Sequence, residues 1–559
     1  MSFTSNLNPM FRSKFSEDIF NQKYAHEGCE TWEKLCNVLV EVICQNDMSK
    51  TDKDDLTKYM TDLKFIAGGR YLYYAGRKAK FYNNCYLLRA EEDTREDWAD
   101  LSWKSESCLM TGGGIGVDYS RYRGKGGQLS RTGGTASGPL PKMFMINEIG
   151  RNVMQGGSRR SAIYASLNHG HADINDFLEA KNWDKQMVGT TGLSVKDLKA
   201  QDFNYAAPLD MTNVSVNYDT KWLETYLATG DYGEVFLKNV EQALRTAEPG
   251  FSFNFYDKEN ETLRNACTEV TSEDDSDVCN LGSINLGRVT DLSEFMHITE
   301  LGTKFLLCGT LRADLPYYKV QTVREKNRRL GLGLMGIHEW LIKSGSKYEV
   351  TPELHLWLNE WRDTSDNTAT YFAHTLGVSR PVAVRAIAPT GTIGILAGTT
   401  TGIEPLYAVA YKRRYLKGTQ WHYQYVVDGT AQELIDIYGA DPTKIESATD
   451  LSTDVERRIA FQADIQDYVD QAISSTINLP AWGSELNNEN TVKPFANTLA
   501  KYAPRLRGFT CYPDGARGGQ PLTSVNYYEA VSQLGTEFEE GLQVHDICDI
   551  SGKGGSCGV

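Results

Sequence analysis

The chain alternates amphipathic stretches with short β-type runs along most of its length. Apolar residues recur every three to four positions in 31–45 and again in 56–66, which predicts helices near the N-terminus. The segment 68–77, GGRYLYYAGR, interrupts this periodicity. Further on, 211–219 and 250–257 read as short strands. Strands that alternate with helices predict an α/β protein built on a mostly parallel sheet or barrel.

The composition is that of a folded globular protein and excludes a disordered or fibrous chain. The 559 residues are 41% hydrophobic and 23% charged, and the net charge is −15. So acidic a chain is a poor candidate for coating nucleic acid, although a local cradle for a single nucleotide is compatible with it. No signal-type segment and no run of 18 apolar residues occurs, so we expect a cytoplasmic protein without a membrane span.

Eleven cysteines are spread along the chain, without a CxxC or a zinc-finger spacing. In a reducing compartment such cysteines are mostly free thiols, and we expect no metal site within the chain. A single cysteine is most often a small buried residue without a chemical role. We expect this structural role for the cysteines outside any motif: Cys29, Cys36, Cys44, Cys108 and Cys308.

Two glycine-containing segments are candidate phosphate sites. The segment 111–139 combines many glycines with four basic residues, and it could bring backbone N–H groups close to an anion or form a flexible loop. It fits neither the Walker nor the Rossmann pattern. The second segment, APTGTIG at 388–394, follows a strand-like run. Thr390 or Thr392 could cap the helix expected there, whose N-terminus would favour a phosphate.

Asn265, Cys267 and Glu269 form the most informative spacing in the sequence. In an extended segment these alternate residues share one side, which puts a thiol between an amide and a carboxylate. The carboxylate disfavours a thiolate, so the group does not suit a cysteine protease. It suits a neutral thiol in hydrogen-atom chemistry, with Glu269 as general base and Asn265 as hydrogen-bond donor. Three unrelated loop residues would give the same spacing, so the wider sequence has to decide.

Asn-x-Cys-x-Glu at 265–269, followed by CNLGSINL from Cys279, resembles the finger loop and next strand of ribonucleotide reductase catalytic subunits. Further motifs follow in this family's order: NNC at 83–85, GGGIGVDYSRYR from Gly112, NRRLGLGLMG at 327–336, the turn at 388–394 and RGFTCYPDGARGG at 507–519. The resemblance covers about residues 65–520 and is closest to the cobalamin-dependent, class II branch. It implies a ten-stranded α/β barrel of two five-stranded parallel halves around a central finger loop.

The resemblance divides the chain into a short helical region at 1–68, the barrel at 69–520 and a C-terminal tail at 521–559. The first matched cysteine is Cys85, which leaves no room for the N-terminal regulatory cone of many relatives. We therefore expect no inhibition by dATP through such a cone. The absence of a C-terminal glycyl-radical motif argues against the anaerobic class.

The resemblance also implies a role for each matched residue. Cys267 would become the thiyl radical that removes the 3′-hydrogen of the ribose, Glu269 would take the 3′-hydroxyl proton, and Asn265 would bind the substrate hydroxyls. Cys85 and Cys279 would reduce C2′ and become a disulfide, so they should be adjacent in the fold. The implied substrate-binding positions are Asn84, Gly114, Thr390, Gly391, Thr392 and Gly394.

A regulatory site for a dNTP or ATP effector is implied as well. Asp93, Lys125 and Arg131 match positions near the effector. The run 141–154 would be a helix at the interface of a homodimer, and 201–213 would link effector to substrate.

Two sources of the radical are open. In the partner-dependent class, two adjacent tyrosines lie on the last barrel strand, where this chain has Cys511 and Tyr512. Tyr527 and Tyr528 could be a substitute relay or plain packing. The chain resembles a compact, phage-associated clade that is class II-like yet pairs with a ferritin-like subunit, so a dimetal site in such a partner is the favoured source. The alternative is adenosylcobalamin acting on a self-sufficient enzyme.

Cys548 and Cys557 match the C-terminal thiols that re-reduce the active-site disulfide by exchange with an external dithiol of the thioredoxin or glutaredoxin type. The expected reaction converts ribonucleotides, diphosphates more readily than triphosphates, to deoxyribonucleotides for DNA synthesis. It would take place in the cytoplasm, or in an infected host cell if the chain is phage-encoded. An inactive nucleotide-binding homologue is disfavoured, because the cysteine set and Glu269 are complete.

Overall fold

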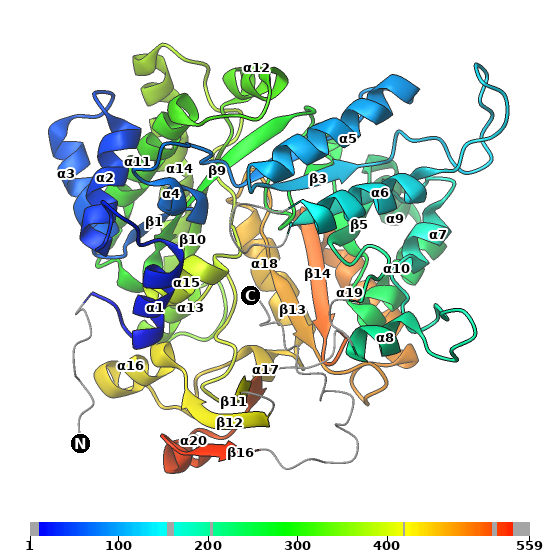
Figure 1. Cartoon of the computed structure of the whole chain (residues 1–559). Coiled ribbons are helices and arrows are strands. Elements are labelled where there is room, and N and C mark those ends of the chain that lie inside the picture. The colour runs from blue at the N-terminus through cyan, green and yellow to red at the C-terminus, as the bar shows by residue number, and fades with distance from the viewer. Residues whose placement is uncertain (1–9, 154–160, 202–204, 418–419, 517–521, 540–559) are drawn as a thin grey trace.

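The structure is a computed structural model. Its described residues are 10–153, 161–201, 205–417, 420–516 and 522–539. Three helices come first and lie together at one side of the molecule in Figure 1: α1 (Lys14–Lys23), α2 (Trp32–Cys44) and α3 (Lys50–Thr61). No helix within the described ranges is long and apolar enough to cross a membrane.

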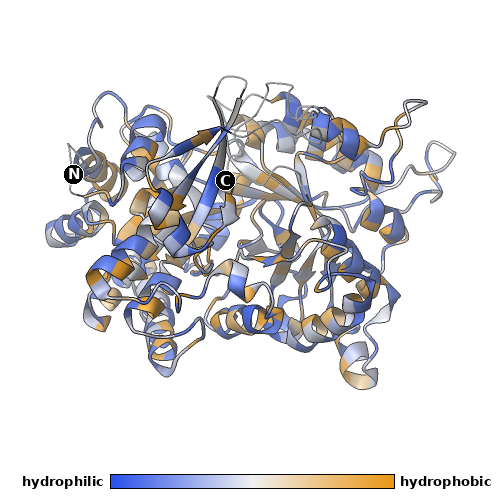
Figure 2. Cartoon of the chain, turned by 90° about the horizontal axis from the view of Figure 1, so that it is seen from below, coloured by the Kyte–Doolittle hydropathy of each residue, from blue (hydrophilic) through white to orange (hydrophobic). Residues whose placement is uncertain are grey.

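Five parallel strands form the first half of the central sheet, in chain order: β2 (Cys85–Leu88), β3 (Gly114–Asp118), β4 (Ile163–Asn168), β5 (Thr212–Tyr218) and β6 (Gly250–Phe253). Helices connect successive strands: α5 (Arg95–Met110), α6 (Pro139–Asn152), α7 (Ile174–Glu179), α8 (Val195–Gln201), α9 (Thr220–Thr229) and α10 (Gly233–Thr246). Seen from below in Figure 2, the outer helices carry both hydrophilic and hydrophobic positions, as amphipathic helices on a sheet do.

The second half is built from β9 (Asp277–Asn285), β10 (Leu330–Met335), β13 (Thr476–Leu479) and β14 (Gly508–Pro513), which pair in parallel as β9–β10 and β13–β14. Its helices are α11 (Leu292–Arg312), α12 (Tyr318–Asn327), α13 (Ile337–Lys343), α14 (Pro352–Leu376), α15 (Gly391–Ala397), α16 (Gly429–Tyr438), α17 (Ala448–Leu451), α18 (Val455–Gln466) and α19 (Val492–Tyr502).

The ring closes through a segment that is not a regular strand. Residues 383–387 pair in parallel with β10 at the Leu332–Arg385 bridge, and with the chain that enters β13 at the Ile387–Ile473 bridge. Antiparallel pairing of β2 with β9, and of β6 with β14, joins the two halves. Ten strand positions therefore surround the centre, in the two five-stranded parallel halves that the sequence predicts.

A short antiparallel hairpin lies against the inner side of this sheet. Its strands are β7 (Leu263–Arg264) and β8 (Thr271–Ser272), and β7 packs against β2 and β3. At Gly116 of β3 a Cβ atom would lie 1.6 Å from the carbonyl oxygen of Arg264. Only glycine therefore lets the hairpin approach the strand so closely.

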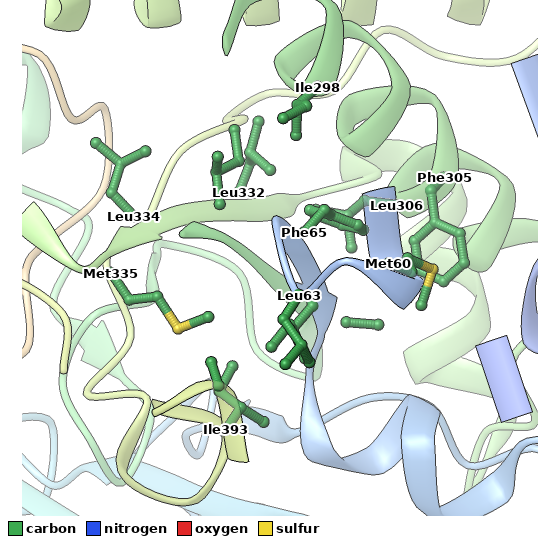
Figure 3. Close-up of a cluster of buried hydrophobic side chains, with 14 of the residues drawn as sticks. Met60, Leu63, Phe65, Ile298, Phe305, Leu306, Leu332, Leu334, Met335 and Ile393 are labelled. Atoms are coloured by element: carbon green, nitrogen blue, oxygen red, sulfur yellow. The ribbon is translucent and has the colours of Figure 1, made fainter. Parts of the chain in front are cut away.

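The N-terminal region differs in detail from the prediction. The helical pattern of 56–66 extends too far, because α3 ends at Thr61 and β1 (Phe65–Ala67) then pairs antiparallel with β9. The segment predicted to interrupt the helices forms α4 (Gly69–Tyr74), whose Tyr71 and Leu72 side chains are buried. Figure 3 shows the core that joins α3, β1, α11, β10 and α15, with labelled side chains of Met60, Leu63, Phe65, Ile298, Phe305, Leu306, Leu332, Leu334, Met335 and Ile393.

A second sheet lies below the barrel in Figure 1 and has the order β15–β11–β12–β16. It consists of β11 (Ala410–Lys417), β12 (Gln420–Val427), β15 (Leu522–Ser524) and β16 (Glu537–Glu539), with α20 (Tyr527–Gln533) packed on it. Residues 522–539 are thus folded against β11 and β12, strands that lie between α15 and α16, while the division of the chain at residue 521 stays a prediction.

Candidate active site

Two buried cysteines face each other across the junction of the two barrel halves. Cys85 of β2 is the register partner of Cys279 of β9, and both are thiols. Directly opposite residues of an antiparallel pair have Cα atoms about 4.5–5.5 Å apart. Disulfides span about 4.4–6.8 Å between Cα atoms, so this register suits a disulfide without movement of either strand.

The hairpin ends in a tight turn that carries the Asn-x-Cys-x-Glu motif. The Asn265 carbonyl accepts from the Thr268 N–H at 3.0 Å, and the Asn265 side-chain oxygen accepts from the Val270 N–H at 3.0 Å. Thr268 has a φ of 72°, which an extended strand does not contain. Cys267 is exposed at the tip, whereas Asn265 and Glu269 are buried. The expectation that the three share one side of an extended segment is therefore wrong, because the turn reverses the chain within the motif.

Both halves of the barrel hold this turn. The side-chain amide of Asn265 donates to the sulfur of Cys85 at 3.3 Å. On β5, the Asn213 amide donates to the Ala266 carbonyl at 3.3 Å. From the second half, the Ala472 N–H donates to the Glu269 carbonyl at 2.9 Å. The turn that bears Cys267 is thus fixed relative to the thiol pair.

Burial controls the protonation of the site. It raises the pKa of Glu269 to about 7 against the opposing effect of Asn265, and Glu269 Oε2 has no hydrogen-bond partner among the described residues. Burial, followed by the negative charge of Glu269, raises the pKa of Cys85 to about 12. Burial likewise raises the pKa of Cys279 far above its usual value. Near neutral pH the site therefore combines two neutral thiols with a carboxylate that can gain or lose a proton.

Some of the residues expected to bind substrate, or their neighbours in the chain, lie beside this centre. Ala388 packs in one apolar cluster with Cys279 and with residues of the hairpin, so the 388–394 turn begins beside the thiol pair. At Gly114 a Cβ atom would come within 3.4 Å of the Ala266 Cβ. Asn84 precedes Cys85, and its side-chain oxygen is buried without a hydrogen-bond partner among the described residues.

The predicted cap of α15 is only partly correct. Thr390 occupies the N-cap position with a φ of 49°, but no side chain caps the helix. The Thr390 hydroxyl instead accepts from the Gly402 N–H at 2.8 Å, which ties the turn to the loop after the helix. Thr392, Gly391 and Gly394 lie within the first turns of α15.

The three residues expected near an effector, Asp93, Lys125 and Arg131, do not all line the same cavity. The Asp93 carboxylate accepts from Arg123 Nε at 2.6 Å and from Trp98 Nε1 at 3.0 Å. Lys125 lines a cavity of about 600 Å³, together with Phe144 and other residues of α6 and its approach. Arg131 is exposed and is not part of the lining. Much of the 111–139 segment is ordered structure, since it includes β3.

The candidate relay tyrosines belong to two different parts of the fold. Tyr512 is on β14, the last barrel strand. Tyr527 and Tyr528 are the first residues of α20, the helix that packs on the second sheet. Their ring centroids are 5.3 Å apart, and Tyr528 is 60% exposed. Cys548 and Cys557 lie outside the described residues.

Charged residues at the base of the hairpin were not identified from the sequence. Glu261 Oε2 accepts from Thr271 Oγ1 at 2.8 Å and from Arg507 Nη2 at 3.0 Å. Burial would raise the pKa of Glu261, but the cations Arg507, Arg329 and Lys258 lower it to about 2. Arg329 and Arg507 occur in two of the quoted motifs. A charged residue next to an otherwise apolar strand was the sequence signal that could have identified them.

The comparisons with known proteins identify the family of this chain. A model of the ribonucleotide reductase barrel domain matches residues 83–222, 220–356 and 377–503. The match covers more than half of the sequence, and the chain therefore belongs to the ribonucleotide reductase family.

Two named relatives and one solved structure are similar to the chain. The vitamin B12-dependent ribonucleoside-diphosphate reductase of Mycobacterium tuberculosis is 27% identical over 537 residues, covering 86% of this chain and 75% of that protein. A protein of Mycobacterium phage D29, named as an adenosylcobalamin-dependent ribonucleoside-triphosphate reductase, is 27% identical over 554 residues, with 84% and 75% covered. The Actinobacillus ureae class Id ribonucleotide reductase alpha subunit has a TM-score of 0.69 at 17% identity, covering 91% of this chain and 98% of that one. This last likeness concerns the fold alone.

Proposed function

We propose that the chain reduces ribonucleoside diphosphates to deoxyribonucleoside diphosphates, with Cys267 as the radical-bearing thiol and Cys85 and Cys279 as the reductant pair. The observation that carries the proposal is the register that sets Cys85 opposite Cys279 beneath the Asn-x-Cys-x-Glu turn. The diphosphate is favoured because the Mycobacterium tuberculosis relative is named for that substrate.

Each group of the site has a role in this reaction. Cys267, exposed at the tip, removes the 3′-hydrogen of the ribose, and Glu269 accepts the 3′-hydroxyl proton. The 2′-hydroxyl leaves as water, while the two thiols give up two electrons and two protons and become a disulfide. Asn265 orients the substrate hydroxyls. The residues Asn84, Gly114 and the 390–394 turn hold the remainder of the nucleotide.

Adenosylcobalamin is the radical source that we propose, and when bound it would supply the radical chemistry that removes a hydrogen atom from the Cys267 thiol. The exposure of Cys267 fits this role, because the sulfur can be reached from outside the buried thiol pair. Relatives that depend on vitamin B12 or adenosylcobalamin support it, and they favour the self-sufficient enzyme over the ferritin-like partner preferred from the sequence. Tyr512, Tyr527 and Tyr528 are then assigned to packing.

Regulation and reductant supply complete the proposal. The cavity lined by Lys125 and Phe144 is a candidate effector site, and the exposed apolar residues of α6, Phe144 and Met145, support a homodimer contact there. Cys548 and Cys557 would pass electrons from an external dithiol to the disulfide. Such a cycle suits a reducing compartment such as the cytoplasm.

Deoxynucleotide formation by the purified chain tests the proposal. The assay contains CDP, dithiothreitol and a nucleoside triphosphate effector, with and without adenosylcobalamin. We expect dCDP only with adenosylcobalamin, and less product from CTP. If product forms only when a co-encoded ferritin-like protein is added, that protein and not adenosylcobalamin is the radical source. No product under either condition would contradict the proposed function.

A further inference from the structure

A buried carboxylate lies next to the thiol pair on the interior face of the barrel. Asp277 precedes Cys279 by two residues on β9, so both side chains point to the same side of the strand. Asp277 Oδ2 accepts from Ser272 Oγ at 2.6 Å, from Asn327 Nδ2 at 2.9 Å and from Arg329 Nε at 2.9 Å. Asp277 is fully buried, and the Arg329 side chain is 4% exposed.

This carboxylate joins several of the elements that position the thiols. Ser272 belongs to β8, the return strand of the hairpin that bears Cys267. Asp277 is the register partner of Leu87 on β2, two residues beyond Cys85. Arg329 immediately precedes β10, the other neighbour of β9. The hairpin, both thiol-bearing strands and β10 therefore meet at one ion pair.

The place of the ion pair in the fold indicates its role better than any contribution of the pair to the stability of the protein. A buried ion pair must repay the desolvation of both charges, so apolar residues of equal volume often stabilise a fold as well or better. A slip of β9 by one residue would turn Cys279 to the opposite face of the sheet. Hydrogen bonds from three directions onto a single carboxylate oxygen oppose such a slip.

We propose that the Asp277–Arg329 pair is a positioning device that holds the finger hairpin and Cys279 in the geometry required for a disulfide with Cys85. The roles of the two thiols in turnover rest on the proposed function, whereas their geometry does not. The charged groups that face Cys279 are Arg329, Asp277 and Glu269, and Cys85 also faces it.

Equilibration with oxidised and reduced dithiothreitol tests the device without substrate. Exchange transfers two electrons and two protons from Cys85 and Cys279 to the cyclic disulfide, giving a protein disulfide and reduced dithiothreitol. The fraction of Cys85–Cys279 disulfide is measured by peptide mass spectrometry after acid quenching and alkylation. For Arg329→Lys and Asp277→Asn we expect the equilibrium constant for the disulfide to fall by about tenfold, as coupling within a contacting network predicts.

Arg385→Lys is the matched control, because Arg385 is also 4% exposed and paired, at 2.7 Å, with Asp366. It should lower the thermal unfolding temperature while leaving the disulfide equilibrium within about twofold of wild type. Ser272→Ala is the milder variant should the charge variants fail to fold, and it should weaken the disulfide in the same direction. An equal change in Arg385→Lys, or no change in folded Arg329→Lys and Ser272→Ala, would overturn the proposal.

The outcome is separable from that of the proposed function. A normal disulfide in wild type and a weakened one in the variants would support the positioning device even if no deoxynucleotide formed in the activity assay. A wild-type chain that forms no Cys85–Cys279 disulfide would overturn the device whatever its activity.

Discussion

The side-chain amide of Asn265 donates to the Cys85 sulfur across 3.3 Å, which joins the finger-loop turn to the reducing pair. Its oxygen meanwhile accepts from the Val270 N–H and closes that turn. One residue therefore sets both the shape of the turn and its distance from the thiols. The chemistry proposed for the site needs this coupling, because hydrogen abstraction and C2′ reduction act on adjacent carbons of one ribose.

Replacing the exposed thiol should abolish chemistry and spare the fold. For Cys267→Ser we expect no detectable deoxynucleotide, an unchanged nucleotide affinity and a stability within about 0.5 kcal/mol of wild type, since the residue is exposed. Turnover assays, nucleotide titration and urea unfolding measure the three quantities. Cys308→Ser is the reverse control, because that cysteine is buried in a different apolar cluster from the hairpin residues, and it should lose stability but keep activity. Normal turnover by Cys267→Ser would exclude the radical role.

The reducing pair should be needed for repeated turnover. We expect Cys85→Ser and Cys279→Ser to stop multiple turnover with dithiothreitol, since neither variant can form the disulfide. Product per chain over time is the measurement. Cys511→Ser serves as the control, because Cys511 is equally buried but packs in the cluster with the outer helices. Sustained turnover by either pair variant would remove these thiols from the reaction.

Glu269 should make both activity and stability depend on pH. Its pKa is raised to about 7 by burial, so the basic form required for catalysis accumulates above that pH, and kcat/KM should rise through pH 7. The same shift means that Glu269 favours the folded state at low pH and loses this contribution as pH rises through about 7. Relative to wild type, Glu269→Gln should therefore gain up to about 3 kcal/mol of unfolding free energy between pH 4 and pH 8.

Urea unfolding of both proteins at the two pH values isolates this contribution, because all other titrating groups are shared. Glu269→Gln should also be inactive at every pH. A stability difference that does not change with pH would contradict the raised pKa.

The close approach of the hairpin to β3 should make Gly116 indispensable. The added Cβ of Gly116→Ala would overlap the Arg264 carbonyl oxygen, so the hairpin or the strand has to move, at a cost of about 3 kcal/mol. We expect lower stability and a large loss of kcat. Gly429→Ala is the control, since no atom lies within 4 Å of its Cβ position and it begins α16. That variant should be neutral or up to about 1 kcal/mol more stable. Equal behaviour of the two variants would contradict the packing.

The sequence predicts the barrel more fully than its details. Alternating elements indicate a mostly parallel sheet or barrel, and the family resemblance implies ten strands, but the 383–387 segment joins the ring through isolated bridges, which periodicity does not reveal. Residues 522–539 read as a tail because their partners, β11 and β12, lie about 100 residues earlier. Long-range pairing of this kind has no local signal.

The functional site was likewise predicted only in part. The motif identifies Cys267 and Glu269, yet not the turn that buries one and exposes the other. The Asp277–Arg329 pair was missed because Ser272, Asp277 and Arg329 come from three elements and meet only through the register of the sheet. Arg123, the partner of Asp93, was missed for a similar reason, as 30 residues separate the two.

The most direct test of the central claim is a single turnover in the absence of reductant. A prereduced chain carrying Cys548→Ser and Cys557→Ser, which cannot pass the oxidation on to the C-terminal thiols, is mixed with CDP, effector and adenosylcobalamin, quenched in acid and analysed for dCDP and for the Cys85–Cys279 disulfide. We predict that the two products form in equal amounts and at the same rate. Formation of dCDP without that disulfide, or with a disulfide between other cysteines, would contradict the account.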